Sequence, residues 1–279
     1  MANMFSGLEA FGLGNLSGMD VYDGKDKDIA NKPNEEEKSS FLEEDFIFDK
    51  TFTCPVCDQE FKTKTVKSGK VKLQSLDTDL RPIYQNMDPL KYDAIVCPNC
   101  GFAALNRFFK YVTAAQASQI KVNISAAFRG IKETAGVFEY DDAIARHKLA
   151  LLNAIVKKAK TSERAYTCLK TAWVIRGKKD NLPKNLPDYD KQITELEKEE
   201  LDFISKAYIG FEEAFSKEDF PMCGMDEVTI TLLMAELARR IGKNEESSRW
   251  ISKVLISRNA NERIKQKARD IKDLLKEQK

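Results

Sequence analysis

Hydrophobic and polar positions along the chain follow two different periods, and the change falls near residue 106. Between residues 46 and 106 the apolar residues stand in short runs or alternate with polar ones, which is typical of short β-strands. From residue 107 onward they recur at helical spacing over long stretches, which is typical of amphipathic helices. The pattern predicts an α+β, mainly α, fold: a small β module followed by an array of antiparallel helices.

Several helical stretches are expected in the second part, separated by glycine or proline. The loops between them are short, so consecutive helices should pack in opposite directions. Residues 140–150 and 242–254 resemble tetratricopeptide repeats, with Ala235 and Ser247 placed where two helices would touch. A generic helical bundle is the alternative to such a repeat-like array. The expected helices are 107–130, 138–159, 161–177, 188–217, 225–242, 244–258 and 260–277.

The β module is expected to contain strands that lead into two cysteine motifs. The segment 46–53 is β-prone and precedes the first motif, and the apolar run Tyr92–Val96 precedes the second. Alternation on either side of Ser68 and Gly69 predicts a hairpin with its turn there. A strand that enters a Cys-Pro-x-Cys turn, twice, is the layout of a zinc ribbon.

The two motifs are Cys-Pro-Val-Cys and Cys-Pro-Asn-Cys, each with two residues between its sulfurs. Two such pairs can surround one Zn²⁺ with four thiolates in a tetrahedron. Four thiolates leave no open coordination position, so the spacing predicts a single structural zinc ion. The predicted ligands are Cys54, Cys57, Cys97 and Cys100.

Three alternatives to zinc stay open. An iron–sulfur centre uses the same ligand type, a redox-active Cys-x-x-Cys pair would stand at a helix N-terminus, and the cysteines could be unpaired core residues. Asp58 and Gly101 directly follow the two motifs and are expected at positive φ, which Gly and Asp tolerate. Cys168 and Cys223 stand alone, so each is expected to be a small buried hydrophobe.

Charge is distributed unevenly along the chain. Residues 1–50 carry five Lys or Arg against twelve Asp or Glu, whereas residues 51–135 carry twelve against seven. The expected domains are a disordered acidic arm (1–45), a zinc-ribbon-like module (46–106) and a helical repeat-like domain (107–279). Large apolar residues in the arm would also suit a docking motif. They are Phe5, Leu8, Phe11, Leu13 and Leu16.

The first twenty residues do not have the pattern of a secretory leader, so none is expected, and no run approaches the roughly 20 apolar residues that span a bilayer. The chain is therefore expected in the cytoplasm, without a membrane partner. Asp77 and Asp79 near Arg81 favour a structured turn over a catalytic pair. His147, the only histidine of the chain, is expected to be a packed helix residue.

A group of lysines in the predicted hairpin could follow nucleic-acid phosphates. The favoured interpretation is a solvated strand edge whose lysines limit aggregation. The net charge of +1 gives no general attraction to nucleic acid either, so a nucleic-acid partner is not expected. The lysines are Lys62, Lys64, Lys67, Lys70 and Lys72.

Three stretches carry a resemblance: Cys54–Cys57, Asp77–Pro82 and the run from Tyr92 to Ala104, of which the second cysteine motif is the most specific. Together they resemble a bacterial family of unknown function, domain-of-unknown-function family 2225. The resemblance covers about residues 50–260 and leaves the acidic arm outside. It implies a bacterial cytoplasmic protein with a metal, a cysteine-rich N-terminal region and a helical, repeat-like remainder. It implies no activity.

The sequence favours a zinc-binding, non-enzymatic scaffold that binds a protein or peptide partner through its helices. Two alternatives remain: a nucleic-acid-associated zinc ribbon, and an enzyme with an unrecognised site near Asp79 and Arg81. No common catalytic motif is present in the sequence, so no residue is predicted to be catalytic and no cofactor besides Zn²⁺ is expected.

Overall fold

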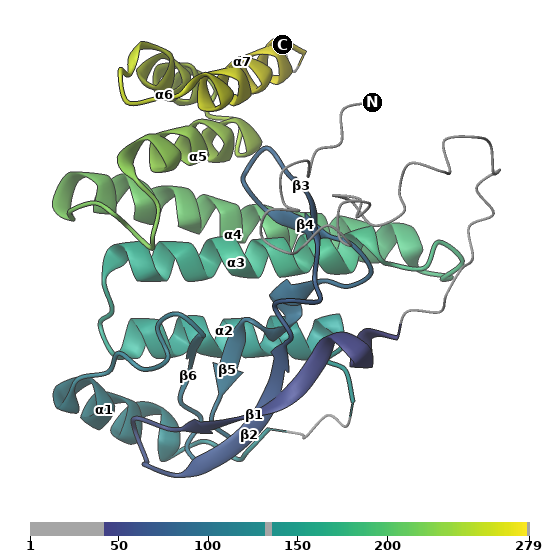
Figure 1. Cartoon of the computed structure of the whole chain (residues 1–279), viewed down its shortest axis with the longest axis vertical. Coiled ribbons are helices and arrows are strands. Elements are labelled where there is room, and N and C mark those ends of the chain that lie inside the picture. Colours follow the sequence, from purple (N-terminus) through teal and green to yellow (C-terminus); the bar gives the residue numbers. More distant parts are fainter. Residues whose placement is uncertain (1–41, 132–135, 278–279) are drawn as a thin grey trace, which may run out of the picture. The chain divides into compact units, whose positions relative to one another are not determined.

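The computed structural model describes residues 42–131 and 136–277. The apolar positions of the arm fall outside these residues, so its predicted disorder and its docking motif stay predictions. In the described part of the chain, small antiparallel strand pairs come first and helices follow (Figure 1). This order confirms the predicted α+β, mainly α, fold.

The strands form three separate two-stranded antiparallel sheets. The β1–β2 pair is the longest, and its register runs from Ile47 opposite Val66 to Thr53 opposite Glu60. The β3–β4 pair contains a register shift, whereas the β5–β6 pair is regular. The strands are β1 (Ile47–Thr53), β2 (Glu60–Val66), β3 (Leu73–Leu76), β4 (Pro82–Tyr84), β5 (Ala94–Val96) and β6 (Ala103–Leu105).

The hairpin predicted around Ser68 and Gly69 is wrong in its pairing. A turn does form there, with the Lys70 N–H donating to the Lys67 carbonyl over 2.9 Å, but it joins strands of different sheets. β2 pairs with β1, and β3 pairs with β4. The physical reason is that the first cysteine motif is itself a tight loop. It returns the chain from β1 directly to β2, so β1 is the first strand that β2 can reach.

Helices begin after residue 113, and from residue 140 onward they match the predicted stretches to within a few residues. None of the helices in the described ranges combines the length and apolar character needed to cross a bilayer. The helices are α1 (Ala114–Ile120), α2 (Tyr140–Val156), α3 (Thr161–Asp180), α4 (Tyr189–Lys217), α5 (Glu227–Arg240), α6 (Asn244–Ile256) and α7 (Glu262–Glu277), with a π-helical turn (Lys121–Ser125) after α1 and 3₁₀ turns at Glu43–Phe46 and Pro89–Tyr92.

The first predicted helix, 107–130, begins too early. Residues 107–110 form turns, residues 111–113 have no regular structure, and α1 starts at a capping box made by Thr113 and Gln116. The Gln116 N–H donates to the Thr113 hydroxyl at 3.3 Å, and the Thr113 N–H donates to the Gln116 side chain at 3.1 Å. The preceding Phe109 is buried in the apolar cluster around the cysteines instead. The Thr-x-x-Gln spacing was the signal that could have placed this helix start.

From α2 to α7, each helix packs against the next across a short loop (Figure 1). Their inner faces share one apolar cluster, in which Tyr208 and Phe211 of α4 are fully buried. Where α5 and α6 touch, the Ser247 hydroxyl donates to the Ala235 carbonyl at 2.8 Å. These are the two small residues that the sequence placed at a close helix contact.

The α3–α4 pair depends on a close backbone approach at Gly210. A Cβ added to Gly210 would lie 2.8 Å from the Cβ of Ala165 on α3. Near the same end of the pair, the Glu218 carboxylate accepts hydrogen bonds from the Ser162 N–H at 3.1 Å and from its hydroxyl at 2.6 Å. Glu218 thus caps the first turn of α3 from the segment that follows α4.

The β strands and the helices share apolar contacts across residue 106, the predicted boundary between two domains. Phe109, Ile120 and Ile124 lie beyond that boundary and belong to the cluster that surrounds the cysteines. β5 and β6 also contact α2. Separate folding of 46–106 and 107–279 stays a prediction.

We expect Gly210→Ala to destabilise the protein, although alanine favours a helix interior by about 1 kcal/mol over glycine. The new methyl group would meet Ala165 at 2.8 Å, and overpacking of this kind costs about 1–3 kcal/mol. The loss should be smaller when it is measured in an Ala165→Gly background, which removes the opposing methyl group. Chemical denaturation gives the free energies of unfolding.

Gly69→Ala is the control for this comparison, because no atom lies within 4 Å of a carbon added there. An equal loss in the two backgrounds would show that contact with Ala165 is not the cause.

Candidate functional site

The structure brings the four motif cysteines to one place. Cys54 and Cys57 lie in the loop between β1 and β2, and Cys97 and Cys100 lie in the loop between β5 and β6. All four sulfurs lie within 4.8 Å of one another. Two antiparallel hairpins therefore present their loops to each other, and each contributes two sulfurs to a group that could hold a metal ion.

The two loops have the same backbone geometry. The Asp58 N–H donates to the Cys54 carbonyl at 2.9 Å, and the Gly101 N–H donates to the Cys97 carbonyl at 3.1 Å. Asp58 has a φ of 59° and Gly101 a φ of 72°, which confirms the positive φ predicted for both. This tight turn folds the two sulfurs of each motif to the same side.

Two close sulfur pairs join one motif to the other. The sulfurs of Cys54 and Cys100 are 3.6 Å apart, and those of Cys57 and Cys97 are 3.7 Å apart. A disulfide would need about 2.05 Å, so these are free thiols. Four sulfurs in a tetrahedron around Zn²⁺, at a bond length of about 2.3 Å, stand about 3.8 Å apart. The observed separations fit one metal ion held by all four.

The close thiols shift one another's pKa values. The pKa of Cys97 is lowered, because the thiols of Cys100 and Cys54 donate hydrogen bonds to its sulfur. The pKa of Cys100 is raised, because its own proton is shared with Cys54 and Cys97 and because it is buried. So many buried sulfurs can all ionise only beside a compensating positive charge. A divalent cation bound there would supply that charge and displace the protons.

Groups from the helical segment hold the second loop by its backbone. The Ser125 hydroxyl donates to the Cys100 carbonyl at 2.8 Å, and the Asn153 side chain of α2 donates to the Gly101 carbonyl at 3.0 Å. Gly101 is also required for packing, since an added Cβ would lie 2.7 Å from the ring of Phe128. Sequence reasoning missed Ser125 and Asn153, and no sequence signal pointed to them, because they bind carbonyl groups more than twenty residues away.

Aromatic rings pack around the cysteines on the side that faces the protein interior. The ring of Phe109 contacts three other rings, with centroids between 5.0 and 6.0 Å away. Cys54, Cys97 and Cys100 are buried, and Cys57 is partly exposed. Neither motif stands at a helix N-terminus, which is where a low-pKa redox pair would be expected. The other rings of the cluster are Phe52, Phe61 and Phe102.

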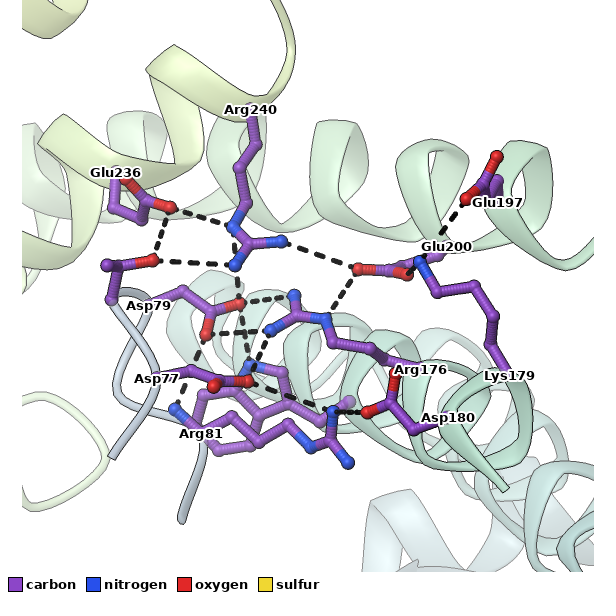
Figure 2. A network of polar contacts seen from close by, with 12 residues as sticks. Asp77, Asp79, Arg81, Arg176, Lys179, Asp180, Glu197, Glu200, Glu236 and Arg240 are labelled. Carbon is purple, nitrogen blue, oxygen red and sulfur yellow. Dashed lines mark hydrogen bonds and ion pairs between the residues drawn. The ribbon is translucent and has the colours of Figure 1, made fainter. Parts of the chain in front are cut away.

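A second polar cluster forms where the β3–β4 hairpin meets α3, α4 and α5 (Figure 2). The tip of this hairpin runs from Asp77 to Arg81. Leu80 has a φ of 68°, and its N–H donates to the Asp77 carbonyl at 3.0 Å. The turn places Asp79 at the end of the hairpin, where its side chain is fully buried.

Arg176 of α3 is the central partner of this tip. Its guanidinium binds both carboxylate oxygens of Asp79, at 2.6 and 3.0 Å, and its Nε binds Glu200 of α4 at 2.7 Å. It also contacts Asp77 at 2.9 Å, and the Trp173 indole N–H donates to Asp79 at 3.1 Å. Charge-assisted, bidentate contacts of this kind are among the strongest that side chains make.

Arg240 of α5 adds a further layer to the cluster (Figure 2). Its Nε binds Glu236 at 2.8 Å, and its guanidinium lies 3.6 Å from Glu200 and 3.8 Å from Asp79. The Thr78 hydroxyl at the hairpin tip donates to Glu236 at 2.6 Å. Helices α3 and α5 therefore bind the β-turn directly, and α4 contributes Glu200, which binds Arg176 and lies near Arg240.

The cluster has the properties of a structural clamp. Burial alone would raise the pKa of Asp79, but the hydrogen bonds and charge of Arg176 outweigh burial, and the pKa is lowered. The carboxylate is thus ionised at neutral pH with both oxygens engaged, which is unfavourable for proton exchange with a substrate. The carboxylate of Asp77 lies 3.7 Å from the Arg81 guanidinium and 2.9 Å from that of Arg176, so Arg176 is its closer partner.

Sequence reasoning missed the helix residues that bind the tip of the β3–β4 hairpin. A signal existed: Arg176 stands in the apolar run that contains Trp173, and Glu236 interrupts the apolar middle of α5. A charged residue at an otherwise buried helix position needs an opposite charge nearby. The sequence could have indicated paired charges in this way, but not which helices supply them.

The remaining candidates lie apart from the cysteines. His147 is fully buried, its Nδ1 lies 2.7 Å from the Ala143 carbonyl, and burial lowers its pKa. Cys168 is buried and Cys223 is partly buried, and burial raises the pKa of each to about 11. Lys64 pairs with Asp49 at 3.1 Å on the exposed face of the β1–β2 sheet. The states of His147, Cys168 and Lys64 agree with the roles expected from the sequence, whereas Cys223 is only partly buried and its thiol donates to the Ser162 carbonyl at 3.4 Å.

Fold and site together define a class of protein in which two β-hairpins with a four-cysteine site are joined to a stack of helices. The model of a family described as uncharacterized proteins conserved in bacteria (DUF2225) matches residues 47–275, and the chain belongs to this family. The match confirms the resemblance carried by the cysteine motifs. Comparisons with curated proteins and with solved structures found no match.

We expect Asp79→Asn to lower the free energy of unfolding by about 3 kcal/mol, because it leaves the buried Arg176 without its bidentate partner. Urea denaturation of the variant and the wild type measures this difference. Asp202→Asn is the matched control, since Asp202 is exposed on α4. A loss in Asp79→Asn no larger than in the control would contradict the clamp.

The same pair of proteins gives a pH test. The folded-state pKa of Asp79 is lowered, so its contribution to stability is complete above the ordinary value of 3.8 and is lost as the pH falls through the folded value. The stability difference between wild type and Asp79→Asn should therefore shrink below pH 3.8. A difference that stays constant down to the acid unfolding transition would argue against an ionised Asp79.

Proposed function

We propose that the protein binds one Zn²⁺ through Cys54, Cys57, Cys97 and Cys100, and that this ion is structural. The main support is the arrangement of the sulfurs, whose cross-motif separations of 3.6 and 3.7 Å fit the edges of one tetrahedron. When bound, the ion would supply a closed four-thiolate centre without a position for water or substrate. Its role would be to hold the β1–β2 and β5–β6 loops together.

The same geometry favours zinc over an iron–sulfur cluster. A cluster contains several irons bridged by sulfide, so its cysteine sulfurs stand around a larger body than a single ion. Sulfurs that lie within 4.8 Å of one another leave room for one ion. A single iron ion in the same place is distinguished by elemental analysis.

We expect purified protein to contain about one Zn²⁺ per chain, and Cys57→Ser or Cys97→Ser to remove it, because a closed site with three thiolates binds zinc far more weakly. Elemental analysis after dialysis measures the content. Cys168→Ser and Cys223→Ser are matched controls for the loss of a thiol, since neither residue belongs to the sulfur group.

Two results would contradict the proposal. One is protein that contains no zinc after purification without chelators. The other is zinc whose X-ray absorption spectrum shows an exchangeable oxygen ligand in place of one sulfur.

We further propose that the protein is a non-enzymatic scaffold for a protein or peptide partner. The support is twofold: the carboxylates of Asp79, Glu200 and Glu236 in the cluster at the β3–β4 tip are occupied by internal contacts, and the helical stack presents apolar side chains to solvent. Leu152 and Ile155, one turn apart on α2, are 49% and 52% exposed. We call this pair the α2 face. Such apolar positions on a rigid helix are typical of partner-binding surfaces.

Affinity capture from bacterial cells that express the chain tests the scaffold. We expect a specific protein to be captured by wild type and lost with Leu152→Lys/Ile155→Lys, because buried lysines would disrupt an apolar contact. Ile256→Lys is the matched control, since Ile256 is 80% exposed on α6. Capture of no specific protein by the wild type would overturn the scaffold, and capture unaffected by the double variant would exclude the α2 face.

A further inference from the structure

A groove of about 510 Å³ opens at one end of the β1–β2 sheet, away from the first cysteine loop. Phe48 and Lys50 of β1 belong to one face of the sheet, because side chains two residues apart on a strand point the same way. Thr65 of β2 stands opposite Phe48. Among the described residues, no acidic side chain lines the groove. The lining consists of Phe48, Lys50, Thr65, Val66, the turn 67–70 and Asn106.

Three lysines give the groove a positive charge. Lys50 and Lys70 are exposed, and neither forms an ion pair within the part of the chain that the structure describes. The third, Lys67, donates to the main-chain carbonyl of Asp45 at 3.1 Å, and a neutral acceptor does not compensate its charge. Even when the exposed carboxylate of Asp45 is counted with the groove, the lysines outnumber it.

Acidic residues that lie close by are already paired with other lysines. The Asn106 N–H donates to the carbonyl of Asp93 at 2.8 Å, but the Asp93 carboxylate binds Lys170 at 3.0 Å. Asp49 belongs to the opposite face of the sheet, where it binds Lys64 at 3.1 Å. These pairs leave the groove as a positively charged surface, which is complementary to an anionic partner.

Phe48 adds an exposed aromatic ring to this surface. It is 42% exposed, whereas Phe52 and Phe61 on the same face are buried in the cluster around the cysteines. The Nζ of Lys50 lies 5.1 Å from the centre of the Phe52 ring, so this lysine stands between the buried rings and the exposed one. A flat ring beside several cations is the combination on which a base stacks while neighbouring phosphates meet lysines.

We infer that this groove binds single-stranded nucleic acid, with one base stacked on Phe48 and backbone phosphates on the three lysines. A duplex keeps its base faces inside the helix, so it could use the lysines but not the ring. An acidic peptide would also use the lysines alone. A single strand carries one phosphate for each nucleotide, so its successive phosphates can meet Lys50 and Lys70 while a base meets the ring.

This inference departs from the expectation drawn from the sequence, in which residues 62–72 form one solvated strand edge. In the sheet, Lys62 and Lys64 belong to the face opposite the groove. The pairing of β1 with β2 instead brings Phe48 and Lys50 beside the turn 67–70. Because local alternation did not identify the strand that β2 pairs with, the sequence could not place an aromatic ring among these lysines.

Fluorescence anisotropy with the full-length protein tests the inference, with labelled oligothymidylate and oligouridylate of about ten nucleotides as probes. We expect saturable binding at about 50 mM salt, and a slope of log K against log salt of about −2, because each of three phosphate contacts contributes about −0.7. Lys50→Gln/Lys70→Gln should reduce the size of this slope by about 1.4. Phe48→Leu should weaken binding about fivefold or more at an unchanged slope, because it removes stacking but no charge.

Lys62→Gln/Lys64→Gln is the matched control, because it removes the same charge from the opposite face of the same sheet. Far-UV circular dichroism should show an unchanged fold in every variant. Binding of neither probe by the wild type, an equal loss in the two double variants, or unchanged binding in Phe48→Leu would each overturn the inference. Binding of duplex DNA or polyglutamate as tightly as the two probes would also overturn it, since neither presents base faces.

This inference does not depend on the scaffold function, since the α2 face lies outside the lining of the groove. It also fails separately from the zinc proposal. Protein that contains zinc but binds neither probe contradicts only the nucleic-acid groove. Protein without zinc that still binds a probe contradicts only the metal assignment.

Discussion

Ionisable groups that leave water must find opposite charge inside the protein, and the arrangement of this chain depends on that requirement. Asp79 is stable at the tip of a buried hairpin only because Arg176 binds both of its oxygens, and Arg176 is in turn stable only beside Glu200. The requirement also fixes the register in which the β3–β4 hairpin packs against the helices. A shift of one residue would bring Thr78 or Leu80 to the guanidinium and leave charges unpaired, so the hairpin can dock on the helices in one way.

The cysteine group obeys the same rule with a different partner. Four thiols held within 4.8 Å cannot all ionise by themselves, and a metal ion bound among them would supply the charge that allows it. Around this group the helical segment contributes hydrogen bonds from Ser125 and Asn153. The contacts that join the strands to the helices therefore include neutral hydrogen bonds near the sulfurs and ion pairs at the β3–β4 tip.

Much of this could be read from the sequence, and the failures have specific causes. Helix positions followed from apolar spacing, and the positive φ of Asp58 and Gly101 followed from their place after each motif. The Ser68–Gly69 hairpin failed because local alternation does not say which neighbour a strand pairs with. The ion pair between Asp79 and Arg176 was missed because the two residues are far apart in the chain. A single sequence indicates that a buried charged residue needs an oppositely charged partner, but it does not identify that partner.

The second cysteine loop is held through its main chain, since the side chains of Ser125 and Asn153 donate hydrogen bonds to the carbonyls of Cys100 and Gly101. The side chains at the loop tip, those of Pro98 and Asn99, take no part in these hydrogen bonds, and Asn99 is exposed. Every residue type carries a main-chain carbonyl. In evolutionary terms, the side chain at position 99 is therefore free to change without the loss of either hydrogen bond.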